Sequence, residues 1–326
     1  MDSASALPEI SIVVPCFNEG LSLLELRERI MKVFQRSQQY EIIFVDDGSS
    51  DETRTILSGL RDANIRYIRL RRNFGKSAAL SVGFREARGR VIVTLDSDLQ
   101  DQPEEIPALL GKMDQEGLDL VSGWKQQRQD SLGKTLFSRI FNWVTARLTG
   151  IRIHDFNCGL KAYRREVIEE IKVQGEMHRY IPVLASYRGF RVGEVAVSHA
   201  PRKYGQSKYG AGRLLGGFFD LMTVIMLTRY NRKPLHAFGV MGVVLATVGV
   251  GIETYLAIRW FQGQWIANRP AFMLGVLLTI IGVQFIFFGL LAEMIAYSSQ
   301  REEDYGARAI SPRAEYLAEG IHRLSR

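Results

Sequence analysis

Hydrophobic residues in the first third of the chain follow two alternating patterns. Short runs rich in Ile and Val occupy residues 10–15, 41–45, 65–70 and 91–95. Between these runs, apolar residues recur every three or four positions, over residues 21–37, 51–62 and 76–87. Continuous β-branched runs are typical of buried strands, and spacing of three or four is typical of amphipathic helices. Because the two patterns alternate, they predict an α/β layer with a mainly parallel sheet.

Two segments in the last third of the chain are apolar on every side. Residues 235–258 carry one acidic residue, Glu253, near their far end, and residues 271–297 carry Gln284 and Glu293 as strongly polar groups. Each segment exceeds the roughly 20 residues that a helix needs to cross a hydrocarbon core. A buried hairpin of a soluble protein is the alternative, and these lengths disfavour it. The pattern therefore predicts two transmembrane helices.

The positive charge of the chain is concentrated before the first apolar segment. The formal net charge is +7, and residues 198–236 hold seven Lys or Arg side chains against Asp220 alone. A basic segment beside a membrane span is typical of the cytoplasmic face. Arg259 and Arg269, in the short loop between the spans, weaken this count without reversing it. We therefore expect the first half of the chain and its tail in the cytoplasm.

The cysteines and the start of the chain favour the same compartment. Cys16 and Cys158 are the only cysteines and show no metal-ligand spacing, so we expect buried thiols in a reducing environment. The first residues lack the basic start and apolar core of a secretory signal. Nucleic acid is a disfavoured partner, because no stacking aromatic array or recognised nucleic-acid motif accompanies the basic residues.

Polar clusters follow the predicted strands. They lie at residues 15–19, 46–49 and 73–76, and at the pair Asp96 and Asp98. Ligands of parallel sheets bind at the carboxyl ends of the strands, so these clusters are expected to form one site. Neither a G-x-G-x-x-G fingerprint nor a P-loop follows the first strand, which disfavours dinucleotide chemistry and P-loop hydrolysis.

Asp96 and Asp98 are the most informative pair in the chain. They are one residue apart where an extended run ends, so both carboxylates are expected to point the same way. Two close carboxylates repel, and a hard cation such as Mg²⁺ or Mn²⁺, which also binds phosphate oxygens, relieves that repulsion. From these two residues alone, a strand-to-loop turn with solvated acids is an equally good interpretation.

The ordered set of motifs resembles family 2 glycosyltransferases. Within that family it is similar to the polyprenyl-phosphate branch, which includes dolichol-phosphate mannose synthase and bacterial undecaprenyl-phosphate glucosyltransferases. The matching segments are residues 13–19 (VVPCFNE), 45–51 (VDDGSSD), 72–76 (RNFGK), 95–104 (LDSDLQDQPE), 155–165 (DFNCGLKAYRR) and 199–209 (HAPRKYGQSKY). The resemblance covers roughly residues 9–300. It implies a GT-A-type nucleotide-sugar-binding fold with two spans, in the inner or plasma membrane of a prokaryote.

The resemblance assigns a donor site to the clusters after the first three strands. Carboxylates of Asp46 and Asp47 could accept hydrogen bonds from a nucleobase or a ribose. A turn and helix cap built from these acids, Ser49, Ser50 and Asp51 is the alternative. The remaining expected donor-binding residues are Pro15, Phe17 and Glu19 in the same slot, and Lys76 beside the diphosphate. A surface lysine is an equally good interpretation of Lys76.

The expected metal ligands are Asp98 and Gln100, with Asp96 as a third candidate that could contact the ribose instead. Only the family spacing promotes Gln100, which would otherwise be a surface residue. The cation, Mg²⁺ or Mn²⁺, would neutralise the departing diphosphate.

The resemblance also places an acceptor side. Asp155 could act as a base, but a phosphate monoester with a second pKa of about 6 is already a nucleophile at neutral pH. Asp155 could therefore orient the sugar or the acceptor, or merely cap the following segment. Arg128 and Arg139 would bind the lipid phosphate. A loop with Arg202, Ser207 and Lys208 would close over the diphosphates.

Two further segments have apolar faces flanked by basic residues. We predict amphipathic helices in the headgroup plane over residues 131–150 and 211–233, although such a stripe more often packs on a soluble core. The expected organisation is a catalytic domain over residues 1–210, the second interface helix, a transmembrane hairpin over 235–298 and a cytoplasmic tail over 299–326.

The predicted function is the inverting, metal-dependent transfer of one hexose from a UDP- or GDP-sugar to a polyprenyl phosphate, in glycosylation of the cell envelope. The rivals are a processive polysaccharide synthase, whose Gln-x-x-Arg-Trp motif is absent, and a non-catalytic nucleotide-binding scaffold. Glycines at positions 275, 282 and 289, with Gly242 and Gly249, predict close helix packing. The partner helix is the other span or a second protomer, and we expect a homo-oligomer.

Overall fold

The computed structural model describes residues 7–34, 39–126, 142, 144–147, 149–151, 153–171, 173, 175, 177–201, 203–204, 220–226, 228, 230, 233–263 and 270–299. The chain divides into two compact units, residues 1–228 and 229–326. The division falls inside the segment 211–233 that was predicted as the second interface helix.

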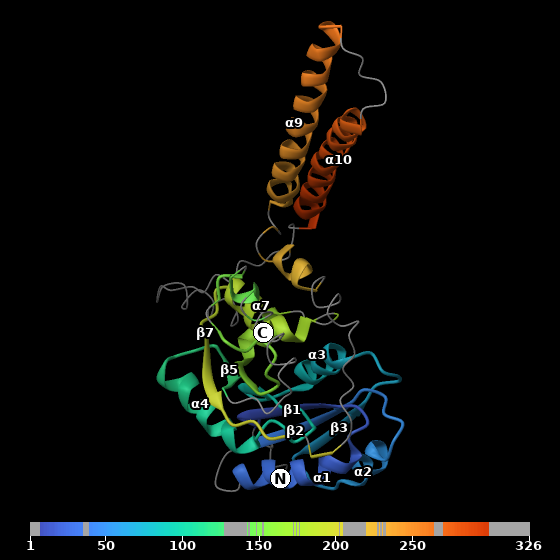
Figure 1. The fold of residues 1–326 in the computed structure, drawn as a ribbon. Coiled ribbons are helices and arrows are strands. Elements are labelled where there is room, and N and C mark those ends of the chain that lie inside the picture. The colour runs from blue at the N-terminus through green and yellow to red at the C-terminus, as the bar shows by residue number, and fades with distance from the viewer. Residues whose placement is uncertain are drawn as a thin grey trace, which may run out of the picture. The chain divides into compact units, whose positions relative to one another are not determined.

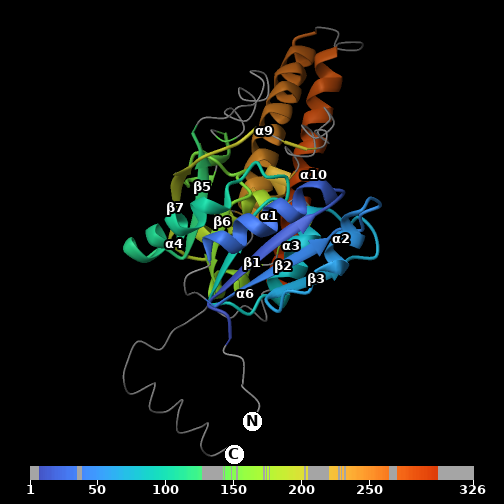
Figure 2. The ribbon, with the colours of Figure 1, turned by 90° about the horizontal axis from the view of Figure 1, so that it is seen from below.

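The first unit is built on one seven-stranded sheet (Figures 1 and 2). Its order is β3-β2-β1-β4-β6-β5-β7. The strands are β1 (Ile10–Cys16), β2 (Tyr40–Asp46), β3 (Ile65–Arg69), β4 (Val91–Thr94), β5 (Leu120–Lys125), β6 (Lys161–Arg164) and β7 (Val192–Val197). Only β6 runs antiparallel to its neighbours β4 and β5; the other pairs are parallel.

Helices cover both faces of this sheet (Figure 2). They are α1 (Gly20–Val33), α2 (Thr53–Gly59), α3 (Lys76–Glu86), α4 (Ile106–Gln115), α6 (Arg165–Glu170) and α7 (Ile181–Tyr187), with short 3₁₀ turns η1 (Pro103–Glu105) and η2 (Met177–Tyr180). One core cluster holds buried residues of α1 and α4, and the other holds buried residues of α3 and α7. The mixed α/β fold predicted from the hydrophobic pattern is confirmed.

Element boundaries differ from the prediction in small ways. The first four strands agree to within one residue, and α1 begins at Gly20, whose amide donates to Asp51 Oδ2 at 3.1 Å. Helix α2 is shorter than the predicted 51–62, because Leu60 adopts an extended backbone with ψ 139° and ends it at Gly59. The apolar periodicity continues past a point where the backbone has already turned.

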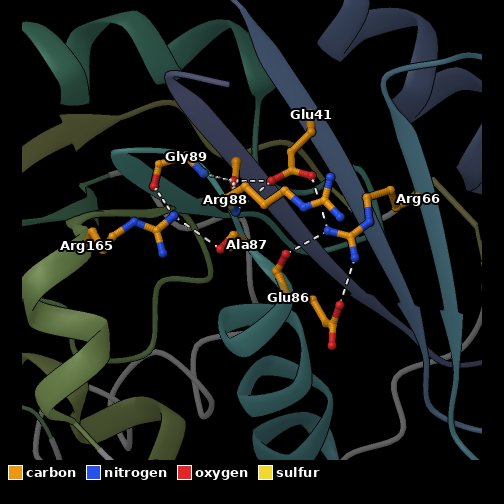
Figure 3. A network of polar contacts seen from close by, with 8 residues as sticks. Glu41, Arg66, Glu86, Ala87, Arg88, Gly89 and Arg165 are labelled. Atoms are coloured by element: carbon orange, nitrogen blue, oxygen red, sulfur yellow. Dashed lines mark hydrogen bonds and ion pairs between the residues drawn. The ribbon is translucent and has the colours of Figure 1, made fainter. Parts of the chain in front are cut away.

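A polar network holds the amino edge of the sheet (Figure 3). The buried Glu41 carboxylate accepts from Ser11 Oγ and from the Arg88 amide, each at 2.7 Å. Arg66 donates to the Glu86 carbonyl at 2.6 Å, and Arg165 donates to the Gly89 carbonyl at 2.6 Å. These contacts hold the turn between α3 and β4, at the opposite end of the strands from the polar clusters.

The second unit is a hairpin of two long helices, α9 (Pro234–Phe261) and α10 (Pro270–Ser299). Both are long and apolar enough to be candidate membrane spans, with mean hydropathies of 2.0 and 2.4. At one end, Glu293 Oε2 of α10 accepts the Leu235 amide of α9 at 3.1 Å. This bond satisfies an otherwise unpaired N–H in the first turn of α9.

The glycine stripe packs inside this hairpin. A Cβ on Gly242 would lie 2.6 Å from the Gly282 carbonyl oxygen, and one on Gly249 would lie 2.7 Å from the Gly275 carbonyl oxygen. Glycine is therefore required for this close approach of the two backbones. Of the two partners considered for the stripe, the structure places the other span against it.

The predicted interface helices are only partly described. Residues 144–147 and 220–226 are helical. In the second segment Leu221, Val224 and Ile225 are buried, whereas Met222 and Met226 are half-buried. Part of the apolar stripe is thus covered by protein, and contact of either helix with a membrane stays a prediction.

Candidate active site

The carboxyl ends of β1, β2 and β4 gather the polar clusters as predicted. The Asn18 amide after β1 donates to Ser49 Oγ after β2 at 2.9 Å. Asp47 in turn binds the loop before α3, and Lys76 at the start of α3 forms an ion pair with Asp96 after β4. The clusters are therefore linked by direct contacts into one site, because parallel strands bring their carboxyl ends to the same edge.

Asp46 is the last residue of β2, and its side chain is fully buried. Its Oδ1 accepts the Ser49 amide at 2.8 Å, and its Oδ2 accepts the Tyr67 hydroxyl at 3.1 Å. Arg69 Nε lies 3.5 Å from the same Oδ2. The turn considered as the alternative for this residue is therefore present, and nucleotide contact by Asp46 stays a prediction.

Asp47 fixes the loop between β3 and α3. Its two oxygens accept the amides of Phe74 and Gly75, each at 2.8 Å. Burial raises the pKa of Asp47, and these two amide donors oppose the rise. Gly48 has a φ of +73°, and a Cβ there would lie 2.5 Å from the Arg72 backbone. Asp47 and Gly48 thus hold the loop that leads to Lys76.

The predicted nucleotide slot begins at β1. Pro15 is buried within the strand, and Phe17 and Glu19 are half-buried in the loop that follows. The Glu19 amide donates to Thr53 Oγ1 at 3.1 Å, so this loop is bound to the start of α2. The three residues lie together at the predicted edge; their contact with a nucleotide stays a prediction.

Asp96 and Lys76 form the central ion pair of the site, between Lys76 Nζ and Asp96 Oδ1. Burial alone would raise the pKa of Asp96, but the charge and hydrogen bond of Lys76 outweigh it and lower the pKa to about 2. Asp96 is therefore a carboxylate at neutral pH. Lys76 thus contacts a predicted metal ligand, and its predicted place beside the diphosphate stays a prediction.

His178 lies close to this ion pair and was not singled out from the sequence. Its Nδ1 is 2.9 Å from Ser77 Oγ, next to Lys76, and its amide donates to the same oxygen at 3.2 Å. Burial, followed by the charges of Lys76 and Arg179, lowers the pKa of His178 well below its usual value. No spacing in the sequence indicates this contact, which joins η2 to α3 across 101 positions.

Asp98 and Gln100 lie in a tight turn after β4. Asp98 Oδ1 accepts the Gln100 amide at 3.2 Å, and both side chains are half-buried. Leu99 between them has a φ of +61° and a buried side chain. Carboxylate and amide oxygens are ligands that Mg²⁺ and Mn²⁺ accept, so this donor set fits the predicted cation. Among the described residues, no three His, Cys, Asp or Glu side chains gather as a metal site, and metal binding stays a prediction.

Asp155 is buried beside β5 and β6. Its Oδ1 accepts the Asn157 amide at 3.0 Å, and its carbonyl accepts Ser122 Oγ at 3.4 Å. Lys161 is also buried, donates to the Cys158 carbonyl, and has a pKa lowered by burial. The capping role considered for Asp155 is present, and a role in orienting the substrates stays a prediction.

A second ion pair below the Asp98 turn was missed. Asp101 Oδ1 and Lys125 Nζ are 2.6 Å apart, and Asp101 is 1% exposed. Asp101 lies in residues 95–104, one of the segments that resemble the family. Lys125 ends β5, a strand that the hydrophobic pattern did not predict.

The remaining predicted site residues lie outside the described ones: Arg128, Arg139, Arg202, Ser207 and Lys208.

The chain is similar to known proteins over most of its length. Residues 11–172 match the model of Glycosyl transferase family 2. The chain is 40% identical over 303 residues to dodecaprenyl-phosphate galacturonate synthase from Rhizobium johnstonii, covering 90% of each chain. It is 40% identical over 301 residues to undecaprenyl-phosphate 4-deoxy-4-formamido-L-arabinose transferase from Salmonella choleraesuis, again covering 90% of each.

The fold also matches a solved structure. Glucosyl-3-phosphoglycerate synthase from Mycobacterium tuberculosis, in complex with Mn²⁺, UDP-glucose and phosphoglyceric acid, aligns with a TM-score of 0.53. The alignment covers 68% of this chain and 79% of that one, at 20% sequence identity. At this identity the likeness concerns the fold alone.

Proposed function

Because this chain belongs to glycosyl transferase family 2, we propose that it transfers a single sugar from a nucleotide sugar to a polyprenyl phosphate at the cytoplasmic face of a membrane. The observation that carries the proposal is the 40% identity, over 90% of both chains, to two enzymes named for sugar transfer to a polyprenyl phosphate. The ordered contacts at the carboxyl edge of the sheet and the two candidate membrane spans support it.

The donor would bind along the carboxyl ends of β1, β2 and β4. Phe17 and Glu19 would line the nucleotide slot. Asp46 and Asp47 hold the neighbouring loops through the hydrogen bonds described above. Asp98 and Gln100 would hold a divalent cation, with Asp96 beside them. A bound cation would supply charge neutralisation for the departing nucleoside diphosphate.

The acceptor would not need a strong base. A phosphate monoester with a second pKa of about 6 is largely a dianion at neutral pH and is itself the nucleophile. Attack on the anomeric carbon opposite the nucleoside diphosphate would invert that centre. Asp155 would orient the reactants, while Arg128 and Arg139 would bind the acceptor phosphate through charge-assisted hydrogen bonds.

We predict a hexose, and the two relatives are named for galacturonate and for an arabinose derivative, which is a pentose. Relatives at the same 40% identity to this chain are therefore named for different sugars. A panel of donors is needed to identify it.

The test uses the purified full chain in detergent with undecaprenyl phosphate, UDP- and GDP-sugars, and Mn²⁺ or Mg²⁺. Mass spectrometry should detect a polyprenyl-phosphate sugar with one of the donors, and EDTA should abolish it. Asp98→Asn should lose product at least 100-fold, whereas Asp114→Asn, an exposed acid on α4, should retain wild-type turnover. Absence of lipid-linked product with every donor would contradict the proposed transfer. Near-normal turnover of Asp98→Asn, or full activity of the wild type in EDTA, would contradict the metal assignment.

A further inference from the structure

The segment that carries Asp96, Asp98 and Gln100 is held in an unusual backbone conformation. Leu99 adopts a left-handed φ of +61°, which disfavours any residue with a Cβ. Such a conformation persists only where surrounding contacts determine it. The contacts that hold this segment therefore also set where Asp98 and Gln100 point.

Several contacts fix the segment from different elements. Ser22 Oγ of α1 donates to the Ser97 carbonyl at 2.6 Å, and the Gln102 side chain donates to the Leu99 carbonyl at 3.2 Å. The Ala200 amide donates to the Gln100 carbonyl at 3.0 Å. All of these are hydrogen bonds between neutral groups.

A buried ion pair, Asp101 with Lys125, holds the residue that follows the turn. The two side chains are 1% and 12% exposed, and their charged atoms are 2.6 Å apart. Asp101 also forms an isolated antiparallel bridge with His199 through its backbone. Loss of either partner would leave the other charge buried and uncompensated, which is costly.

The second oxygen of Asp101 faces Asp96. A Cβ on Gly159 would lie 2.5 Å from Asp96 Oδ2 and 2.6 Å from Asp101 Oδ2, so both oxygens border the same small space. Asp101 Oδ2 is buried and has no hydrogen-bond partner among the described residues. Two carboxylates meet here, and their repulsion is balanced by Lys76 on one side and Lys125 on the other.

We propose that Asp101 and Lys125 are positioning residues, whose buried ion pair holds the turn over residues 96–100 in the conformation that binds the nucleotide sugar. Neither side chain needs to touch the substrates for this role. Lys125 neutralises the charge of Asp101, and Asp101 holds the end of the turn. Gly159, which has no Cβ, leaves the space that the carboxylates of Asp96 and Asp101 occupy. This inference rests on the proposed function for the identity of the donor.

The test compares Lys125→Met, Asp101→Asn and the double variant with wild type. Each single variant leaves one buried charge uncompensated, whereas the double variant leaves none. We expect the affinity for UDP or GDP with Mn²⁺, measured by calorimetry, to fall 10- to 100-fold in each single variant and to recover partly in the double variant. Lys125→Arg, which keeps the charge, should recover most of the affinity.

The matched control is Lys112→Met with Glu116→Gln, an exposed ion pair of the same 2.6 Å length on α4. It should change neither nucleotide affinity nor turnover. In transfer assays the single variants should raise the donor KM and leave the acceptor KM unchanged, which a general loss of folded protein would not do. Variants that stay folded and bind nucleotide as wild type does would overturn the inference, as would a double variant no better than the singles. Failure of the wild type to transfer sugar would contradict only the proposed function, because nucleotide binding is measured separately.

Discussion

Gly282→Leu tests whether the hairpin depends on close contact between its two backbones. A Cβ at Gly282 would lie 2.5 Å from the Ala246 amide nitrogen and 2.6 Å from the Gly242 carbonyl oxygen. Both are backbone atoms, so no side-chain rotation relieves the clash. The helices would have to separate by roughly 1 Å before the first carbon fits, and the rest of the leucine would add to that displacement.

The size of the effect follows from two opposing contributions. Overpacking a tightly packed contact costs about 1–3 kcal/mol. Replacing a glycine in the middle of a helix gains roughly 0.5–1 kcal/mol from reduced backbone freedom. Gly251→Leu in α9 is the matched control, because a Cβ there has no atom within 4 Å. Gly251→Leu gains stability from reduced backbone freedom without a clash. The difference in stability between the two variants therefore measures the cost of the clash at Gly282.

The assay is thermal unfolding of both variants in the same detergent, with mass determined by light scattering. Gly282→Leu should unfold several degrees below Gly251→Leu, at unchanged oligomer mass. Equal midpoints would refute the packing argument. A change of mass with unchanged stability would show that the stripe is an interface between protomers, and would bear on the expected homo-oligomer.

Three further predictions concern the catalytic unit. Arg128→Ala and Arg139→Ala should raise the polyprenyl-phosphate KM or lower kcat while donor affinity changes little; a fall in nucleotide-sugar affinity alone would assign these arginines to the donor side. Glu41→Gln should lower stability by about 1–2 kcal/mol, since the buried carboxylate accepts several hydrogen bonds, whereas Glu116→Gln on an exposed pair should be near neutral in thermal unfolding. The pKa of buried His178 lies well below its usual value, so the unfolded chain binds a proton that the folded chain does not as pH falls below about 6.5. Stability should therefore decline from about pH 7 to pH 5, and His178→Asn should flatten that decline; an unchanged slope would rule out His178 as its source.

Local patterns in the amino-acid sequence predict the class of fold and bring the polar clusters to one edge of the sheet. Strand and helix patterns depend on local spacing, so β1 to β4 and the helices between them could be predicted to within a few residues. The carboxyl edge followed from the same pattern, because parallel strands bring the residues after each strand together. The two long apolar segments were equally evident, since length and composition alone define them.

Contacts between polar residues that are distant in the sequence become evident in the folded chain. Lys76 pairs with Asp96, Asp101 with Lys125, and His178 with Ser77 across 101 positions, and no local pattern encodes such pairs. The glycine spacing allowed either the other span or a second protomer as partner, and the hairpin geometry selected the other span. The spacing of apolar residues indicates whether a segment is a helix or a strand. Which side chains contact each other depends on how the fold brings distant elements together.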